Sequence, residues 1–171
     1  MACFAKGLSD MNLKVSIHSL SALLRVIPLY NTRIDPHIST LLSPIGLAVG
    51  SPNSSIRCMA VDVVECVIEN WKATLLINPL LNAAVHANSR GKSIIMKHLA
   101  SLFKRAYSRR PGIVTKTFMR TLLKLSNDKN SEARMAFNKL LSVVYEWKGL
   151  KIMELIPSNN IQFFMNFVNK I

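Results

Sequence analysis

The residues that most often carry enzyme chemistry are few in this 171-residue sequence, and their spacing does not suit catalysis. The four histidines show neither HExxH nor His-x-Glu spacing, and none stands at a metal-ligand interval from a cysteine. They are His18, His37, His86 and His98. The one acidic cluster, Asp62, Glu65 and Glu69, lies at i, i+3 and i+7 of a predicted helix, where pairing with neighbouring cations is favoured over hydrolysis. We therefore expect no catalytic residues, no cofactor and no metal.

The cysteines indicate neither a disulfide framework nor a zinc site. Cys3, Cys58 and Cys66 make an odd number without CxxC spacing, which favours a reducing compartment. Cys58 and Cys66 are about 12 Å apart along one predicted helix, too far to bridge, and we expect both to be buried thiols in the core. The sequence shows no apolar segment typical of a signal peptide or a membrane span, so we expect a soluble intracellular protein without membrane insertion.

The charge of the chain is strongly positive and unevenly distributed. Twenty-two Lys and Arg against nine Asp and Glu give a formal net charge of +13, while half of the residues are hydrophobic. That apolar content excludes a disordered basic tail, so the partner of this folded domain is expected to be acidic: nucleic acid, an anionic membrane surface or an acidic protein. Residues 1–87 carry a net charge of +1, residues 88–151 carry +12, and residues 152–171 carry none.

Four segments share one spacing of apolar residues, which predicts four amphipathic helices. Apolar residues recur at i, i+4, i+7 and i+11, so they fall on one side of each helix. They are Leu13, Ile17, Leu20, Leu24 and Ile27; Ile56, Ala60, Val63 and Val67; Ile95, Leu99, Leu102 and Ala106; and Ala133, Phe137, Leu140, Val144 and Trp147. Successive segments begin 43, 39 and 38 residues apart, as in HEAT or armadillo arrays. The sequence therefore predicts an all-α solenoid.

A short polar turn precedes each of these helices, and a second apolar segment precedes three of the turns. The turns occupy residues 9–12, 51–54, 88–91 and 127–130, whose Asp, Asn and Ser side chains can cap a helix start. The second segments begin at Ile38, Pro79 and Val114, and we expect Pro79 in the first turn of its helix. The repeat is thus helix A, A-to-B turn and helix B.

About three and a half such HEAT-like repeats fit into one domain, residues 1–171. Residues 1–8 resemble the end of an A helix, so the domain is expected to be N-terminally incomplete or to have that end covered. Residues 152–171 depart from the repeat and are expected to form a C-terminal cap. Within it, Ile161, Phe164, Met165 and Val168 mark a short helix.

Stacked repeats align their A-to-B turns along one edge, and these turns carry the candidate binding residues. Amide and cationic side chains there can recognise carboxylates or phosphates through charge-assisted hydrogen bonds. The candidates are Asn12, Lys14, Asn53, Arg57, Arg90, Lys92, Lys129 and Arg134. A second basic cluster, Lys104, Arg105, Arg109 and Arg110, is expected on the opposite edge. It either complements a helix dipole, forms a second contact surface or binds nucleic acid.

With turns and helices assigned, the sequence resembles a TOG domain, the HEAT-type tubulin-binding module of microtubule polymerases, CLASP proteins and crescerins. The resemblance rests on residues 7–15 (GLSDMNLKV), which are similar to the family's "gly-leu-x-asp-x-asn-x-x-val" turn. Residues 125–134 (LSNDKNSEAR) resemble the turn of the last repeat, and residues 139–157 are similar to the ending of crescerin-type TOG domains. The similarity extends over essentially the whole chain and is of the crescerin and CLASP type.

The resemblance implies a non-enzymatic tubulin- or microtubule-binding domain of the cytoplasm and cytoskeleton, with the cilium as a candidate location. A complete TOG domain has six HEAT repeats, so this chain is about two repeats short. Tight binders of free tubulin usually place a Trp in the first repeat's turn, whereas Trp71 and Trp147 here lie near the ends of B helices. Loss of the first repeats would weaken tight binding of the free dimer more than binding to the microtubule lattice through the basic turns, and the sequence leaves open which of the two is the preferred partner.

Two other functions remain open at this point. The +12 segment could follow a phosphate backbone, which makes a nucleic-acid-binding HEAT module one alternative. Aromatic residues for base stacking are sparse there, and Tyr107 is the only one between the cations of residues 104–110, so such binding would not depend on nucleotide sequence. The other alternative is a scaffold for protein interactions whose partner fills the concave face of the array.

Overall fold

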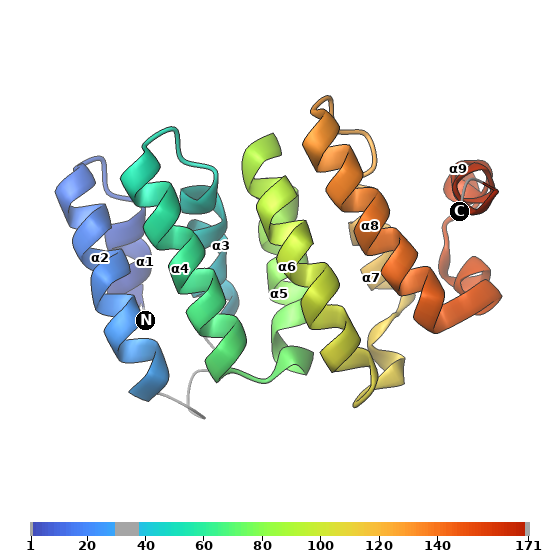
Figure 1. Cartoon of the computed structure of the whole chain (residues 1–171), viewed down its shortest axis with the longest axis horizontal. Coiled ribbons are helices and arrows are strands. Elements are labelled where there is room, and N and C mark those ends of the chain that lie inside the picture. The colour runs from blue at the N-terminus through green and yellow to red at the C-terminus, as the bar shows by residue number, and fades with distance from the viewer. Residues whose placement is uncertain (1, 30–37, 170–171) are drawn as a thin grey trace.

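The computed structural model describes residues 2–29 and 38–169, and these residues form an all-α solenoid of helix pairs (Figure 1). The α-helices are α1 (Ala2–Leu8), α2 (Leu13–Val26), α3 (Ile38–Val49), α4 (Ser54–Asn70), α5 (Ala73–His86), α6 (Ser89–Tyr107), α7 (Lys116–Leu123), α8 (Ser131–Lys148) and α9 (Ile161–Val168). Short 3-10 helices are η1 (Ile27–Leu29), η3 (Pro111–Ile113), η4 (Gly149–Leu155) and η5 (Ser158–Asn160). No strand occurs in the described ranges, and the predicted fold class is confirmed.

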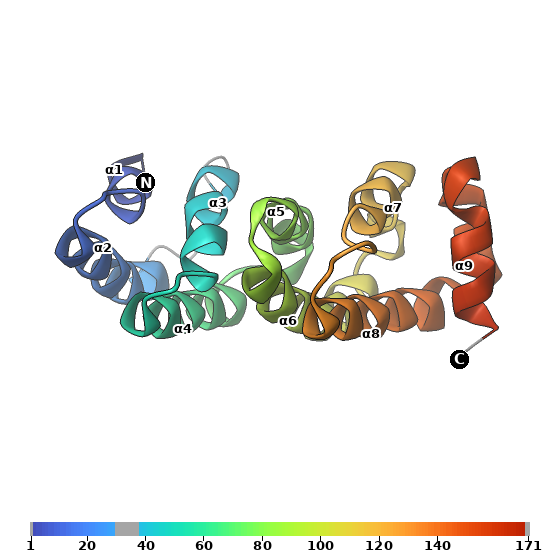
Figure 2. The same ribbon diagram turned by 90° about the horizontal axis from the view of Figure 1, so that it is seen from above.

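The helices form two layers, which Figure 2 shows from above. One layer holds the A helices α1, α3, α5 and α7, and the other holds the B helices α2, α4, α6 and α8. Helix α2 packs on α4 and α6 packs on α8 in the B layer, while α3 packs on α5 in the A layer. Helix α9 stands across the far end of the array. A continuous core lies between the two layers.

Each B helix begins directly after an asparagine whose side-chain oxygen caps it. The Oδ1 atom of Asn12 accepts the N–H of Lys14 at 3.0 Å, and that of Asn53 accepts the N–H of Ile56 at 3.2 Å. The Oδ1 atom of Asn88 accepts the N–H of Gly91 at 2.9 Å, and that of Asn130 accepts the N–H groups of Glu132 and Ala133. Such bonds satisfy amide groups that have no partner within the helix, which explains why the helices start where the polar turns end.

The predicted apolar faces are buried in α4, α6 and α8, apart from Trp147 at the end of α8, but the first one is shifted. In α2 the fully or nearly buried residues are Ser16, Leu20 and Leu23, followed by Ile27, whereas Leu13 is 52% exposed. The Ser16 hydroxyl donates to the Asp10 carbonyl at 3.2 Å, so this side chain turns inward beneath the first turn. The apolar face of this helix was expected to begin at Leu13, and for that residue the prediction is wrong.

Helix α5 begins earlier than Pro79 predicts. It starts at Ala73, and Pro79 lies in its interior, where the ring removes one backbone hydrogen bond. The preceding residues are nevertheless held in the helix because Ala73, Leu76 and Ile77 are buried in the core. Packing of these side chains outweighs the local preference of proline for the first turn, and the expectation for Pro79 is wrong.

The two cysteines of α4 are not the buried core thiols that were expected. Cys58 is exposed and Cys66 is only half-buried. At about 100° per residue, Cys58 lies roughly 200° around the helix from the buried Ile56, and Cys66 lies at the margin of the apolar face. Burial and the nearby charge of Glu69 raise the pKa of the Cys66 thiol, and a hydrogen bond from Asn70 lowers it by less. Neither thiol is part of the core.

Glycines let the second and third repeats approach closely. A Cβ atom at Gly91 of α6 would lie 3.3 Å from both the Gly46 carbonyl oxygen and the Gly50 nitrogen of the α3 segment. Helix α3 consequently packs against α5 and α6, while α4 and α6 make few contacts. Backbone contact at these glycines therefore sets the spacing between the second and third A-to-B turns.

Helix α9 packs against the last repeat through aromatic residues. The ring of Phe164 is fully buried and lies edge-on to Tyr145 at a centroid distance of 5.9 Å, and Phe163 lies 6.1 Å from Phe137. The short helix that Ile161, Phe164, Met165 and Val168 were expected to mark is thus present as α9. Ile161 and Met165 are 38% and 42% exposed, so the contact face of this helix is formed by the phenylalanines.

Candidate functional site

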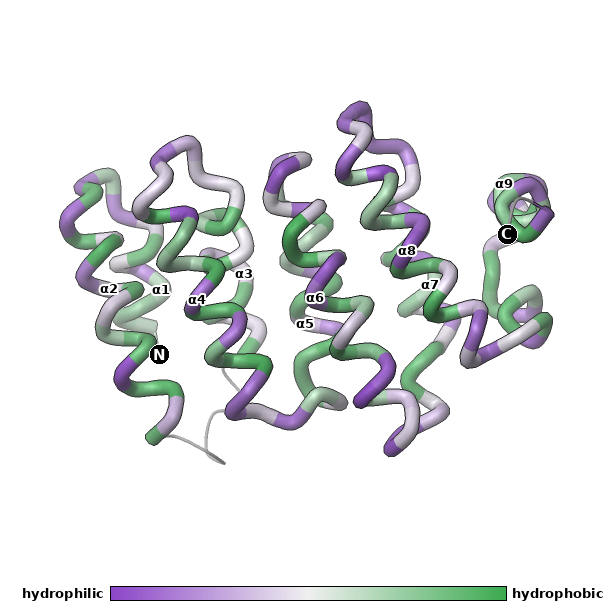
Figure 3. Tube along the Cα trace, viewed as in Figure 1, coloured by the Kyte–Doolittle hydropathy of each residue, from purple (hydrophilic) through white to green (hydrophobic). Residues whose placement is uncertain are grey.

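The four A-to-B turns lie along one edge of the solenoid, the upper edge in Figure 1. We call this edge the turn ridge and define it as residues 9–16, 51–57, 88–92 and 127–134. Figure 3 shows hydrophilic segments gathered at these turns. All eight predicted ridge residues are found there, because each belongs to a turn or to the first five residues after an asparagine cap.

A short hydrogen-bonded loop rigidifies three of the turns. The Oδ1 atom of Asp10 accepts the N–H of Asn12 at 2.8 Å, and that of Asp128 accepts the N–H of Asn130 at 2.9 Å. In the second turn Ser51 Oγ takes this place and accepts the N–H of Asn53 at 3.2 Å. Asp and Ser side chains form such loops with the backbone two residues on. The Asp-x-Asn spacing was a sequence signal for the first and fourth turns that the prediction of ridge residues did not use.

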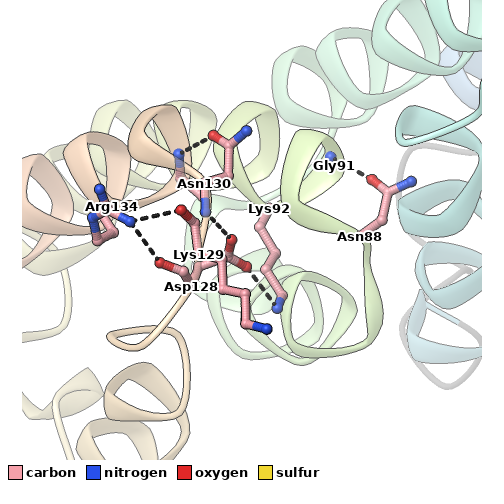
Figure 4. Close-up of polar contacts among 8 residues, drawn as sticks. Asn88, Gly91, Lys92, Asp128, Lys129, Asn130 and Arg134 are labelled. Carbon is pink, nitrogen blue, oxygen red and sulfur yellow. Dashed lines mark hydrogen bonds and ion pairs between the residues drawn. The ribbon is translucent and has the colours of Figure 1, made fainter.

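Arg57 and Arg134 hold their own turns from within. Each stands four residues after the capping asparagine of its helix. The Nη1 atom of Arg57 donates to the carbonyls of Ser51 at 2.8 Å and Pro52 at 3.3 Å. The Nη1 atom of Arg134 donates to the carbonyls of Asp128 at 3.1 Å and Lys129 at 2.7 Å (Figure 4). Both arginines therefore stabilise turn geometry, and the remaining guanidinium N–H groups are what they can offer a partner.

Two further bonds connect neighbouring turns. The Nδ2 atom of Asn88 donates to the Gly50 carbonyl at 2.7 Å, which joins the second turn to the third. The Nζ atom of Lys92 lies 3.0 Å from Asp128 Oδ2, which joins the third turn to the fourth (Figure 4). The Asp128 side chain is only 5% exposed. Lys92, predicted as a contact residue, is thus engaged in an internal ion pair, and three turns are fixed relative to one another.

The environment of Asp128 favours its ionised form. Burial raises the pKa of this carboxyl, but hydrogen bonds from the Asn130 N–H, Ser89 and Lys92, together with the Lys92 charge, hold the pKa below its ordinary value of 3.8. A lowered pKa in the folded state means that ionisation of Asp128 stabilises the fold. This stabilisation is fully present above pH 3.8 and disappears as the pH falls through the lowered pKa.

We expect the variant Asp128→Asn to be less stable than the parent at neutral pH and to lose that disadvantage in acid. The amide keeps a side-chain oxygen that can accept from the Asn130 N–H, but it cannot pair with the Lys92 charge. Urea unfolding midpoints of both proteins, measured from pH 7 to below pH 3.8, should converge as Asp128 becomes protonated. A difference that stays constant across this range would contradict the role of the ion pair.

Asn88 should contribute more to stability than Asn53, because it both caps α6 and joins two turns. Serine also caps helices, so Asn53→Ser should change the free energy of unfolding little. Asn88→Ser keeps a cap but removes the amide donor to Gly50, at a cost of about 1 kcal/mol. Chemical denaturation of the two variants measures this difference, and equal stabilities would show that the link between the turns contributes nothing.

Three predicted residues remain as exposed cations of the ridge. Lys14, Arg90 and Lys129 are exposed and form no ion pair with any residue that the structure describes. Exposed apolar side chains accompany them: Met11 is 99% exposed at the tip of the first turn, and Met135, the residue directly after the last ridge segment, is 63% exposed. The sequence prediction missed these methionines because it searched the turns only for charge and amide groups. The ridge offers cations and apolar contact together.

The second basic cluster lies on the other edge, as its sequence position suggests. Lys104 and Arg105 belong to the last turn of α6, and Arg109 and Arg110 follow it at the lower edge of Figure 1. Lys104 Nζ is 3.9 Å from Glu146 Oε2, and both side chains are more than half exposed. Since such exposed pairs are weak, the cluster keeps its positive charge.

Groups that could hold a metal ion do not gather in the described part of the fold. Among the described residues, no three His, Cys, Asp or Glu side chains lie together in a way that could hold a metal ion. His37 lies outside the described residues. His18 and His86 are exposed. Burial lowers the pKa of the half-buried His98, and the negative charge of Glu65 raises it by less.

Comparison with known proteins points to TOG domains. No model of a known protein family matches the chain. A human protein, TOG array regulator of axonemal microtubules protein 1, is 28% identical to this chain over 109 residues. The match includes 63% of this chain and 6% of that protein, so the chain spans only a small part of its relative.

Two solved structures share the fold. One comes from work on the specificity of TOG–tubulin binding in microtubule dynamics and mitotic spindle formation. It has a TM-score of 0.70 and 18% identity, with 99% of this chain and 65% of that chain covered. The other is the N-terminal domain of MAST/Orbit. It has a TM-score of 0.66 and 15% identity, with 98% of this chain and 77% of that chain covered. The resemblance to TOG domains is thereby confirmed, and the fold is that of these domains.

Proposed function

We propose that this chain is a non-enzymatic tubulin- or microtubule-binding domain that regulates microtubule dynamics through the turn ridge. The observation that carries the proposal is the alignment of four A-to-B turns on one edge, three of which present an exposed cation. The named relatives, an axonemal microtubule regulator and a domain studied for TOG–tubulin binding, support the same partner. They also support a cytoskeletal location, with the cilium as the specific candidate.

Each group on the ridge has a distinct part in the proposed contact. Lys14, Arg90 and Lys129 attract carboxylates of an acidic protein surface and speed the encounter. Met11 adds apolar area at the tip of the first turn, where it can be buried against the partner. The capping asparagines, Arg57, Arg134 and the Lys92–Asp128 pair hold the turns in place before the partner arrives, which reduces the ordering cost of binding.

Co-sedimentation with microtubules at increasing salt tests the proposal. Attraction between exposed charges is screened over about 10 Å at 0.1 M ionic strength, so the bound fraction should fall steeply as salt rises. A gel shift with single-stranded and double-stranded nucleic acid at the same salt tests the other charged partner. Nucleic-acid binding without microtubule binding would contradict the proposal, as would the absence of binding to microtubules at low salt.

The structure offers little for base stacking, which is why nucleic acid is the weaker candidate. Tyr107, the aromatic residue among the cations, lies 5.5 Å from the ring of Phe103 and 5.8 Å from that of Trp147. These neighbours leave the Tyr107 ring half-buried, and Trp147, 41% exposed, is the one exposed aromatic side chain within residues 88–151 on which a base could stack. Nucleic-acid binding would therefore depend mainly on phosphate contacts.

A further inference from the structure

The edge opposite the turn ridge carries cations from two helix ends that lie side by side. The last turn of α6 and the loop after it supply Lys104, Arg105, Arg109 and Arg110, and the end of α8 with η4 supplies Lys148 and Lys151. We call these six residues the distal basic edge. The centroid distance of 5.8 Å between Tyr107 and Trp147 shows that the two helix ends are in contact. Glu146 is the only acidic residue within residues 104–110 and 146–151.

Large apolar side chains are exposed within this edge. Trp147 is 41% exposed and Leu150 is 71% exposed, and a lysine directly follows each of them along the chain. Gly149, between them, has a φ of 60°, a conformation that glycine adopts readily, so the chain changes direction immediately after α8. Leu150 thus stands at the start of η4 between Lys148 and Lys151, with its side chain largely exposed beside the two cations.

Different acidic partners would use these groups to different extents. A nucleic acid would pair its phosphates with the arginines and could stack a base on Trp147, but its polar backbone would leave Leu150 in water. A peptide of acidic residues alone, such as polyglutamate, would use the same cations and leave Leu150 in water. An anionic bilayer surface uses both kinds of group, because Lys and Arg pair with lipid headgroups while Trp and Leu enter the boundary with the acyl chains.

We propose that the distal basic edge docks on an anionic lipid membrane surface, with Trp147 and Leu150 in the headgroup region. The contact is peripheral, since no helix within residues 2–29 and 38–169 has the length and apolar character needed to span a bilayer. It is independent of the turn ridge, which lies on the other edge (Figure 1). A protein with both surfaces could hold a microtubule and a membrane at the same time.

Vesicle co-sedimentation of the 171-residue chain tests this proposal. Vesicles of phosphatidylcholine and phosphatidylserine should bind the chain at least about tenfold more tightly than vesicles of phosphatidylcholine alone. The variant Arg105→Glu/Arg109→Glu/Arg110→Glu should lose this preference. Leu150→Ser, a change at an exposed side chain, should weaken binding several-fold without changing charge. The matched control is Lys14→Glu/Arg90→Glu/Lys129→Glu, which makes the same change in net charge on the ridge and should retain vesicle binding.

Tryptophan fluorescence reports on the same contact. Trp71 is 6% exposed and Trp147 is 41% exposed, so a blue shift on adding anionic vesicles should come from Trp147 and be absent in Trp147→Phe. The proposal is overturned if anionic vesicles neither bind nor shift the emission, or if both triple variants lose vesicle binding equally. Single-stranded DNA and polyglutamate serve as the other acidic probes. The proposal is equally overturned if the variant Arg105→Glu/Arg109→Glu/Arg110→Glu loses binding to one of these probes but keeps its binding to anionic vesicles. None of these outcomes depends on microtubule binding by the ridge.

Discussion

Reversing the three exposed ridge cations, in Lys14→Glu/Arg90→Glu/Lys129→Glu, should weaken microtubule binding by roughly tenfold to a hundredfold, or about 1.4 to 2.8 kcal/mol. These side chains are exposed and form no ion pair within the described part of the chain, so their charge is available to a partner. Co-sedimentation isotherms at low and moderate salt measure the change. The loss should shrink as salt rises, because screening removes both the attraction and the new repulsion.

Lys92 is deliberately left intact in this variant. It pairs with the nearly buried Asp128, so its reversal would place two negative charges together and disturb the turns themselves. Thermal unfolding should confirm that the triple variant is as stable as the parent, within about 0.5 kcal/mol. The charge-matched control is Arg105→Glu/Arg109→Glu/Arg110→Glu on the opposite edge. If both variants lose microtubule binding to the same degree, net charge rather than the ridge controls affinity, and the proposed interface is wrong.

Gly91→Leu should destabilise the fold by about 3 kcal/mol, the largest effect on stability that we expect. Even a Cβ atom at this position would lie 3.0 Å from the Ala87 Cβ and 3.3 Å from backbone atoms of Gly46 and Gly50. A leucine side chain must push α6 away from α3. This movement would also break the bond from Asn88 to the Gly50 carbonyl and shift the third turn relative to the second. Urea denaturation measures the loss of stability.

Gly112→Ala provides the matched control for a glycine substitution. No atom lies within 4 Å of a Cβ built at Gly112, and its φ is not positive, so alanine is accommodated there and should be neutral or slightly stabilising. If Gly91→Leu unfolds at the same urea concentration as Gly112→Ala, the backbone contact between α3 and α6 does not determine the spacing of these repeats.

Much of the fold could be predicted because each B helix carries a regular apolar face. Ile56, Ala60, Val63 and Val67 are all buried, and a periodic pattern of this kind depends only on helix geometry. The start of α5 could not be predicted locally, since core packing before Pro79 outweighs the proline signal. The exposure of Cys58 could have been predicted from its angle around the helix, whereas residue type alone suggested burial.

The position of the turn ridge was predictable, but the roles of its side chains were not. Repeat spacing is enough to align the turns. The partners of Arg57 and Arg134 are carbonyls of their own turns, which a sequence pattern of charged residues cannot reveal. The partner of Lys92 is a carboxylate 36 residues away that only the stacking of repeats brings within 3.0 Å. Three-dimensional contacts therefore divide the predicted residues into those that build the ridge and those that face a partner.

Site-specific photo-crosslinking tests the central claim most directly. A photo-reactive benzoylphenylalanine placed singly at positions 14, 90 and 129 on the ridge should crosslink to tubulin when microtubules are present, and mass spectrometry should identify the tubulin peptides. The same group placed at positions 105 and 109 on the distal basic edge should not, because these positions lie on the opposite edge of the solenoid. Crosslinks to tubulin from positions 105 and 109 but not from the ridge would contradict the account.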